Sequence, residues 1–283
     1  MSKAVITKAA RKKAAIRKEI YWPPFLLAGH RGAAAVEPEN TLRSFAAGLN
    51  AGANAIEFDT RLSKDKKLVV FHDATLERTT NGKGNIHNFT LAELRQLDAG
   101  QGERIPTAKE ALEFIIRKNK AIALLEIKDK DSVKQVVEVV KGVVENKVNW
   151  RNKAIAGKKV ENKALIKNQL LIHSFSSPAV RKIKQLLPTV PTAVVISNRI
   201  YNLPGFFRLC KAIKVDWIFA RHDLVNKTFI AAAHKWKLRV LAWVCNNQEE
   251  MKKFLRMGID GIASDEPRLF TNFHKSYKDG DKR

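Results

Sequence analysis

The stretch AIEFDTRLSKDKKLVVFHD, residues 55–73, holds two apolar runs of strand length separated only by the polar SKDK (63–66). A crossover between parallel strands needs a dozen or more residues, so the second run has to turn back against the first as an antiparallel hairpin. Within the first run, Glu57 and Asp59 are two residues apart and therefore point to the same face of the strand. The stretch predicts a strand with paired acids, followed by a short hairpin strand.

The rest of the chain alternates apolar runs with amphipathic helical patterns. Further runs of strand length lie at 25–30, 121–128, 171–175, 193–198, 216–220, 239–246 and 260–265. Such alternation is typical of βα units with a parallel sheet. Together with the first run of 55–73, these make eight parallel strands. We therefore expect an α/β fold, a closed (β/α)8 TIM barrel with a short hairpin strand after the second barrel strand. An open doubly wound sheet is the alternative.

The barrel pattern predicts one large domain over residues 23–275. Residues 1–22 hold seven Lys and Arg against Glu19 alone, and we expect a basic N-terminal tail or helix there. Residues 276–283 are expected to form a polar C-terminal tail. The segment 146–168 is basic and aperiodic, which predicts a surface insertion between a helix and the next strand.

Charge limits the classes of partner. The 283 residues carry 52 Lys and Arg against 28 Asp and Glu, which gives a net charge of +24 and favours anionic partners. The basic tail either contacts an anionic membrane surface or is simply solvated. No apolar run approaches the roughly 20 residues that span a bilayer. Two cysteines are too few for a disulfide framework. A cytoplasmic protein, at most peripheral at the membrane, is expected.

Three acids at predicted strand ends form a candidate metal site. In a TIM barrel, functional side chains gather at the carboxyl ends of the strands. Glu57 and Asp59 lie on one such strand, and Glu126 occupies the matching end of the next parallel strand. Three carboxylates without a cysteine suit a hard divalent cation, Mg²⁺ or Ca²⁺, better than zinc. Alternatively, the acids pair with Arg or Lys in a structural network.

His30 and His72 stand at the carboxyl ends of two predicted strands, and both therefore lie at the same end of the expected barrel. Because imidazole titrates near neutral pH, two histidines beside a phosphate can divide the roles of general acid and general base. Arg31 and Lys128 are expected to bind phosphate oxygens, although Arg31 could pair with a carboxylate instead. Trp243 either forms a wall for the organic part of a substrate or belongs to the core. The other histidines, His87, His173, His222, His234 and His274, are assigned no role.

Several separated motifs follow one another in a recognisable order. They are GHRG (29–32), PENT (38–41), IEFDTRLSKDKKLVVFHD (56–73), LERTTNGKG (76–84), IPTAKEAL (105–112), LEIK (125–128), HSFSS (173–177), VLAWVCNN (240–247) and GIDGIASDEPRLF (258–270). In this order the motifs resemble the glycerophosphodiester phosphodiesterase family. The resemblance covers about residues 25–270, which is nearly all of the chain except the basic tail.

The resemblance implies a phosphoric diester hydrolase with a (β/α)8 fold. Enzymes of the family use a divalent metal to hydrolyse glycerophosphodiesters to sn-glycerol 3-phosphate and an alcohol. By resemblance, the acid/base pair is His30 and His72, the metal ligands are Glu57, Asp59 and Glu126, and the phosphate contacts are Arg31 and Lys128. In a mechanism proposed for the family, the neighbouring glycerol hydroxyl attacks phosphorus, which gains the high effective molarity of an intramolecular reaction. Water then opens the cyclic diester.

Two alternative functions remain. The segment 81–107 is short and carries no added domain, so the site is open enough to predict a lysophospholipase D-type phosphodiesterase that acts on lysophospholipids. The second alternative is a catalytically silent barrel that binds polyanions through its charge. The presence of both histidines and all three acids argues against this second alternative, and nucleic acid is not expected as a partner.

Overall fold

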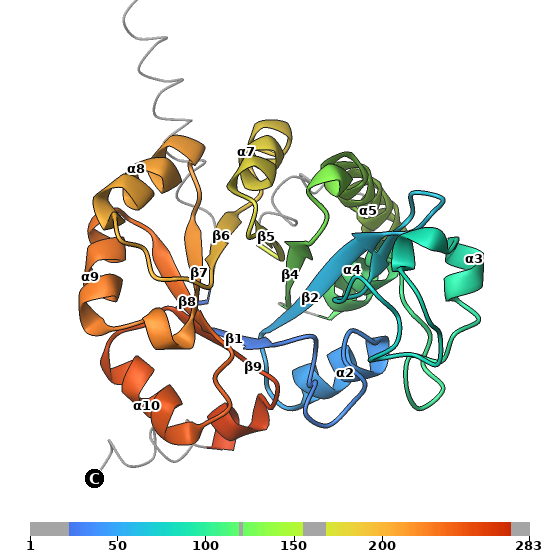
Figure 1. Ribbon diagram of the computed structural model, residues 1–283, viewed down its shortest axis with the longest axis horizontal. Coiled ribbons are helices and arrows are strands. Elements are labelled where there is room, and N and C mark those ends of the chain that lie inside the picture. Colours follow the sequence, from blue (N-terminus) through green and yellow to red (C-terminus); the bar gives the residue numbers. More distant parts are fainter. Residues whose placement is uncertain (1–22, 119–120, 155–167, 273–283) are drawn as a thin grey trace, which may run out of the picture.

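The computed structural model describes residues 23–118, 121–154 and 168–272, and in these ranges eight parallel strands close into a ring (Figure 1). The ring strands are β1 (Leu26–Gly29), β2 (Ala55–Leu62), β4 (Ile122–Ile127), β5 (Leu170–Ser174), β6 (Thr192–Ile196), β7 (Trp217–Arg221), β8 (Arg239–Trp243) and β9 (Gly261–Ser264). Strand β1 pairs with both β2 and β9, which closes the ring. The predicted (β/α)8 barrel is confirmed, and the open doubly wound sheet is excluded because it would leave two unpaired edges.

The hairpin strand is present as well. Strand β3 (Leu68–Val70) runs antiparallel to the outer part of β2, with Thr60 opposite Val70. Directly after β3, the Phe71 N–H donates to the Asp59 carbonyl oxygen at 3.0 Å. The hairpin therefore returns the chain to the carboxyl end of β2 and delivers His72 beside the acids of that strand.

Helices surround the ring of strands (Figure 1). They are α2 (Leu42–Asn50), α3 (Leu91–Leu94), α4 (Ala108–Arg117), α5 (Val133–Ala154), α7 (Ser177–Leu186), α8 (Leu203–Ile213), α9 (Lys227–Lys235) and α10 (Gln248–Arg256), with 3₁₀ turns at Ile86–Asn88, Lys130–Ser132 and His222–Leu224. Polar side chains cap the starts of all of these helices except α5, and Thr107, for example, forms a reciprocal capping box with Glu110 at the start of α4. Among the described helices, none is long and apolar enough to cross a lipid bilayer.

One sequence-based expectation about the helices is wrong. Helix α5 continues to Ala154, so the first part of the expected aperiodic insertion at 146–168 is helical. No Gly or Pro stands between Val143 and Gly157, so nothing in the local sequence stops the helix where its apolar stripe ends. Other segments with sequence-based predictions, 155–167, 1–22 and 276–283, lie outside the described residues.

Side chains inside the barrel are stacked in layers that change from apolar to polar. On β4, Ile122 and Leu124 belong to the buried apolar interior, and Glu126 follows on the same face at the carboxyl end. The strand register places Asp59 opposite Glu126, and Glu126 opposite His173 on β5. A row of ionisable side chains thus crosses three neighbouring strands at the rim where TIM barrels carry their sites.

Candidate active site

The turn after β1 carries the GHRG motif and aims two functional side chains at the rim. Gly32 has a φ of +97°, and a Cβ at this position would lie 2.6 Å from the Ser44 carbonyl oxygen, so only glycine fits without strain. Arg31 also has a positive φ, +52°. In this conformation the Arg31 backbone N–H donates to Glu57 Oε2 at 3.1 Å, and the Arg31 side chain turns toward Asp59. The tight turn is what brings His30 and Arg31 to the acids.

The three predicted metal ligands converge. Glu57, Asp59 and Glu126 are only 5%, 1% and 6% exposed, and each offers a ligand oxygen within 4.8 Å of those of the other two. Taking several carboxylates out of water is costly unless they are compensated by positive charge. The charges around them therefore decide whether the cluster is a closed structural network or a cation site.

Two protein cations compensate part of this charge. Lys128 Nζ lies 3.0 Å from Asp59 Oδ1 and 2.7 Å from Glu126 Oε1, and Arg31 Nε lies 3.3 Å from Asp59 Oδ2. The structural network weighed as an alternative is thus present around Asp59. Glu57 differs: its ion-pair partners among the described residues are two histidines and include no Lys or Arg. The three carboxylates are therefore compensated by only two permanently charged side chains among the described residues, Lys128 and Arg31.

The pKa values reflect this imbalance. Burial, followed by the charges of Asp59 and Glu126, raises the pKa of Glu57 well above its ordinary value. Burial and the neighbouring Asp59 likewise raise the pKa of Glu126 to about 7. Burial acts in the same direction on Asp59, but Lys128 and Arg31 outweigh it and hold the Asp59 pKa below its usual range. A cluster of oxygen ligands that lacks positive charge fits a hard divalent cation.

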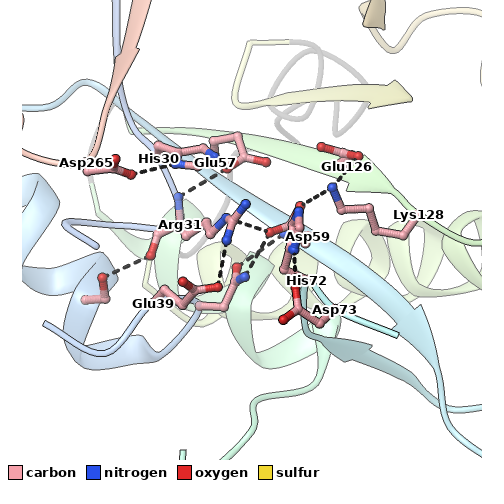
Figure 2. A network of polar contacts seen from close by, with 12 residues as sticks. His30, Arg31, Glu39, Glu57, Asp59, His72, Asp73, Glu126, Lys128 and Asp265 are labelled. Carbon is pink, nitrogen blue, oxygen red and sulfur yellow. Dashed lines mark hydrogen bonds and ion pairs between the residues drawn. The ribbon is translucent and has the colours of Figure 1, made fainter. Parts of the chain in front are cut away.

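Both predicted catalytic histidines are backed by an aspartate (Figure 2). His30 Nδ1 lies 2.6 Å from Asp265 Oδ1, and His72 Nδ1 lies 2.5 Å from Asp73 Oδ1. Because an ionised carboxylate only accepts hydrogen bonds, Nδ1 carries a proton in each ring and Nε2 is left for other partners. His30 Nε2 lies 3.9 Å from Glu57 Oε2. Burial is the main cause that lowers the pKa of His72.

A chain of ion pairs connects the two sides of the rim. Arg31 Nη1 donates to Glu39 Oε1 at 2.8 Å, and Arg78 donates to Glu39 Oε2 at 2.7 Å and to Asp73 Oδ2 at 2.6 Å. This chain fixes Glu39 and Asp73, the side chains that orient Arg31 and His72. Figure 2 shows Glu39 beside Arg31 and Asp73 beside His72. Sequence analysis gave no role to Glu39 or Arg78, although both stand in the quoted motifs PENT and LERTTNGKG.

The cluster opens into a cavity of about 130 Å³ at the rim. Its charged lining comes from His30, Arg31, Glu57, His72, Glu126 and Lys128. The other side is apolar and is formed by Val195, Phe219, Leu241 and Ala263. Trp243 lines the cavity, in edge-to-face contact with Phe175 at a ring separation of 5.9 Å, and Phe175 is 47% exposed at the mouth. The cavity thus combines an ionic half with an apolar half.

His173 belongs to the site although sequence analysis assigned it no role. It lines the cavity, is 2% exposed and packs against Phe219 with ring centres 4.8 Å apart. Burial lowers its pKa to about 3. Its position in the sequence could have identified it. In the strand LLIHS, His173 is two residues after Leu171 and shares its inward face, and β5 is the strand next to the one that carries Glu126.

The structure therefore brings the eight predicted site residues to one end of the barrel: His30, Arg31, Glu57, Asp59, His72, Glu126, Lys128 and Trp243. Their chemical roles remain predictions. The sequence profile of the Glycerophosphoryl diester phosphodiesterase family matches residues 30–269. The chain belongs to this family. Its members are phosphoric diester hydrolases, in agreement with the expected enzyme class.

Individual relatives agree with the family assignment over most of the chain. YhdW of Bacillus subtilis is 35% identical over 252 residues, which span 84% of this chain and 93% of the relative. A glycerophosphodiester phosphodiesterase of Caldanaerobacter subterraneus is 28% identical over 254 residues, 87% of this chain and 96% of that protein. The solved structure of an Oleispira antarctica phosphodiesterase, in complex with its product sn-glycerol 3-phosphate, superimposes with a TM-score of 0.74 at 27% identity and covers 87% of this chain and 95% of its own.

Proposed function

We propose that this family member is a metal-dependent glycerophosphodiester phosphodiesterase that releases sn-glycerol 3-phosphate and an alcohol. One observation carries the proposal: two aspartate-backed histidines flank three converging carboxylates in a single cavity. The family assignment and the product bound to the Oleispira antarctica relative support the substrate class.

The two histidines divide the proton transfers. One Nε2 accepts the proton of the glycerol 2-hydroxyl as that oxygen attacks phosphorus, and the other donates a proton to the departing alkoxide as its P–O bond breaks. The aspartates hold each ring with Nδ1 protonated and stabilise the imidazolium form. Water then opens the cyclic diester, with the two histidines in reversed roles. Each histidine ends the cycle in its starting protonation state.

Charged side chains orient the phosphate. Arg31 and Lys128 line the cavity beside the acids, which supports their binding of phosphoryl oxygens, Arg31 as a fork and Lys128 as a point charge. Glu57, Asp59 and Glu126 would hold Mg²⁺ or Ca²⁺, which supplies further positive charge to the phosphoryl oxygens in the transition state. The apolar half of the cavity, with Trp243, shields the organic part of the substrate from water.

The apolar half also supports the second candidate, a lysophospholipase D-type activity. Phe175 and Trp243 extend the apolar surface to the mouth, where an acyl chain would lie. The silent polyanion-binding barrel has less support, because a charged surface alone does not require aspartate-backed histidines. A cytoplasmic location and contact of the tail 1–22 with an anionic membrane stay proposals from the sequence.

A substrate panel tests the function. Purified protein is incubated with glycerophosphocholine, glycerophosphoethanolamine and lysophosphatidylcholine in Mg²⁺, Ca²⁺ or EDTA, and released glycerol 3-phosphate and lysophosphatidate are quantified. We expect glycerol 3-phosphate with metal and none with EDTA. Lysophosphatidate as the main product would favour the lysophospholipase D candidate. Absence of any metal-dependent release would refute both.

A further inference from the structure

His173 is an unusual buried residue. It is 2% exposed, and neither ring nitrogen makes a hydrogen bond of ordinary geometry among the described residues, although the Leu124 backbone lies close enough to contribute a weak one. A buried polar group that is poorly hydrogen-bonded destabilises the fold, so such groups are rare and are found where function requires them. An apolar side chain would fill the same place beside Phe219 without this penalty.

The nearest acidic group identifies its partner. His173 Nε2 lies 3.7 Å from Glu57 Oε1, slightly beyond hydrogen-bond distance. The other carboxylate oxygen, Glu57 Oε2, already accepts the Arg31 N–H at 3.1 Å. Glu57 is also the acid of the trio that has no Lys or Arg ion pair among the described side chains. Within the described part of the chain, Oε1 is therefore the end of this carboxylate that no other side chain or backbone group holds.

We infer that His173 is a positioning residue that donates Nε2–H to Glu57 Oε1 and fixes this carboxylate when it binds the divalent cation. The inference rests on the proposed metal site. Side chains that hydrogen-bond a metal ligand orient it and commonly contribute 10–100-fold to metal affinity. A shift of less than 1 Å in either side chain closes the 3.7 Å gap to an ordinary hydrogen bond.

The geometry distinguishes this role from direct ligation. The group of ligand atoms that lie within 4.8 Å of one another contains the three carboxylates and not the imidazole. An imidazole ligand would also shift the preference of the site toward softer cations, away from Mg²⁺ and Ca²⁺. The two roles therefore predict different metal selectivity.

The test compares His173→Leu and His173→Gln with the wild type by calorimetric titration of Mg²⁺, Ca²⁺ and Mn²⁺ into EDTA-stripped full-length protein. We expect His173→Leu to weaken the binding of each metal 10–100-fold and by a similar factor. His173→Gln, which keeps an N–H donor, should recover part of the loss. Thr192→Val is the matched control: it removes another buried polar group without a hydrogen-bond partner in the described structure, at the start of β6 and outside the cavity lining, and should leave metal affinity unchanged.

Thermal unfolding of the stripped proteins supplies a second readout. His173→Leu should raise the midpoint while it weakens metal binding, a combination that a merely structural histidine does not give. Unchanged metal affinity in His173→Leu, or a loss confined to Mn²⁺, overturns the inference. If the wild type itself binds no divalent cation, the proposed metal dependence fails first, and the inference fails with it.

Discussion

Glu126 is predicted to destabilise the metal-free fold above neutral pH. Its pKa rises from 4.5 to about 7 in the folded protein. Between these values the folded protein binds more protons than the unfolded chain, so the contribution of Glu126 to stability falls as pH rises from 4.5 to 7. Each pKa unit is worth about 1.36 kcal/mol, so above pH 7 the raised pKa of Glu126 lowers the free energy of unfolding by about 3 kcal/mol.

The perturbation is Glu126→Gln in protein stripped with EDTA. The amide keeps the shape of the side chain but has no charge to bury, so we expect equal stability near pH 4.5 and a gain of about 3 kcal/mol at pH 8. For a domain of this size the gain raises the unfolding midpoint by roughly 5–10 °C. The difference from wild type is the quantity to follow, because the lowered pKa of His173 gives the wild-type profile an opposite slope over part of the same range.

Urea unfolding followed by circular dichroism at pH 4.5, 6, 7 and 8 measures this difference. Glu138→Gln, an exposed acid on α5, is the control and should change stability by less than about 0.5 kcal/mol at every pH. In excess Mg²⁺ or Ca²⁺ the order should reverse, because the wild type gains binding free energy that the variant has lost. A variant that is less stable than wild type at pH 8 in EDTA, or a gain that does not vary with pH, would refute the reasoning.

Three further substitutions probe the site and its support. His72→Ala should lower kcat by about 10²–10⁴-fold with an unchanged circular dichroism spectrum, and near-normal turnover of glycerophosphocholine would contradict its assignment. Asp265→Asn should lower kcat about 10–100-fold with little effect on KM, because His30 loses the carboxylate that stabilises its imidazolium form; a pure KM effect would show that Asp265 acts on binding instead. Gly32→Ala should lower the free energy of unfolding by about 2 kcal/mol or more in urea, since its Cβ would lie 2.6 Å from the Ser44 carbonyl oxygen; an unchanged midpoint would mean that the turn relaxes freely.

Much of the fold was predictable because the barrel depends on local patterns. Each parallel strand is a short apolar run between helices, and the four-residue gap 63–66 left the hairpin as the only connection. The length of α5 was not predictable from amphipathicity, because the helix continues to Ala154 beyond its apolar stripe.

The site was predictable where it follows strand ends and obscure where it depends on loop conformation. Side chains two residues apart on a strand share a face, which put Glu57 and Asp59 together. The register between β2 and β4 brings Glu126 beside them. The Glu39 and Arg78 contacts depend on a loop in which Arg31 takes a positive φ, which no periodicity reveals. For His173 the reason is different: the sequence around it holds no second ionisable strand residue, and only the pairing of β4 with β5 brings it beside Glu126 in the cavity.

The central claim is that the acid trio holds one divalent cation between the two histidines. Crystals soaked in Mn²⁺ and measured at the manganese absorption edge test it most directly. The account predicts one strong anomalous peak within ligand distance of Glu57, Asp59 and Glu126 together, and its loss in Glu57→Gln crystals. A peak elsewhere, or none at this rim in protein that turns over its substrate, would contradict the account.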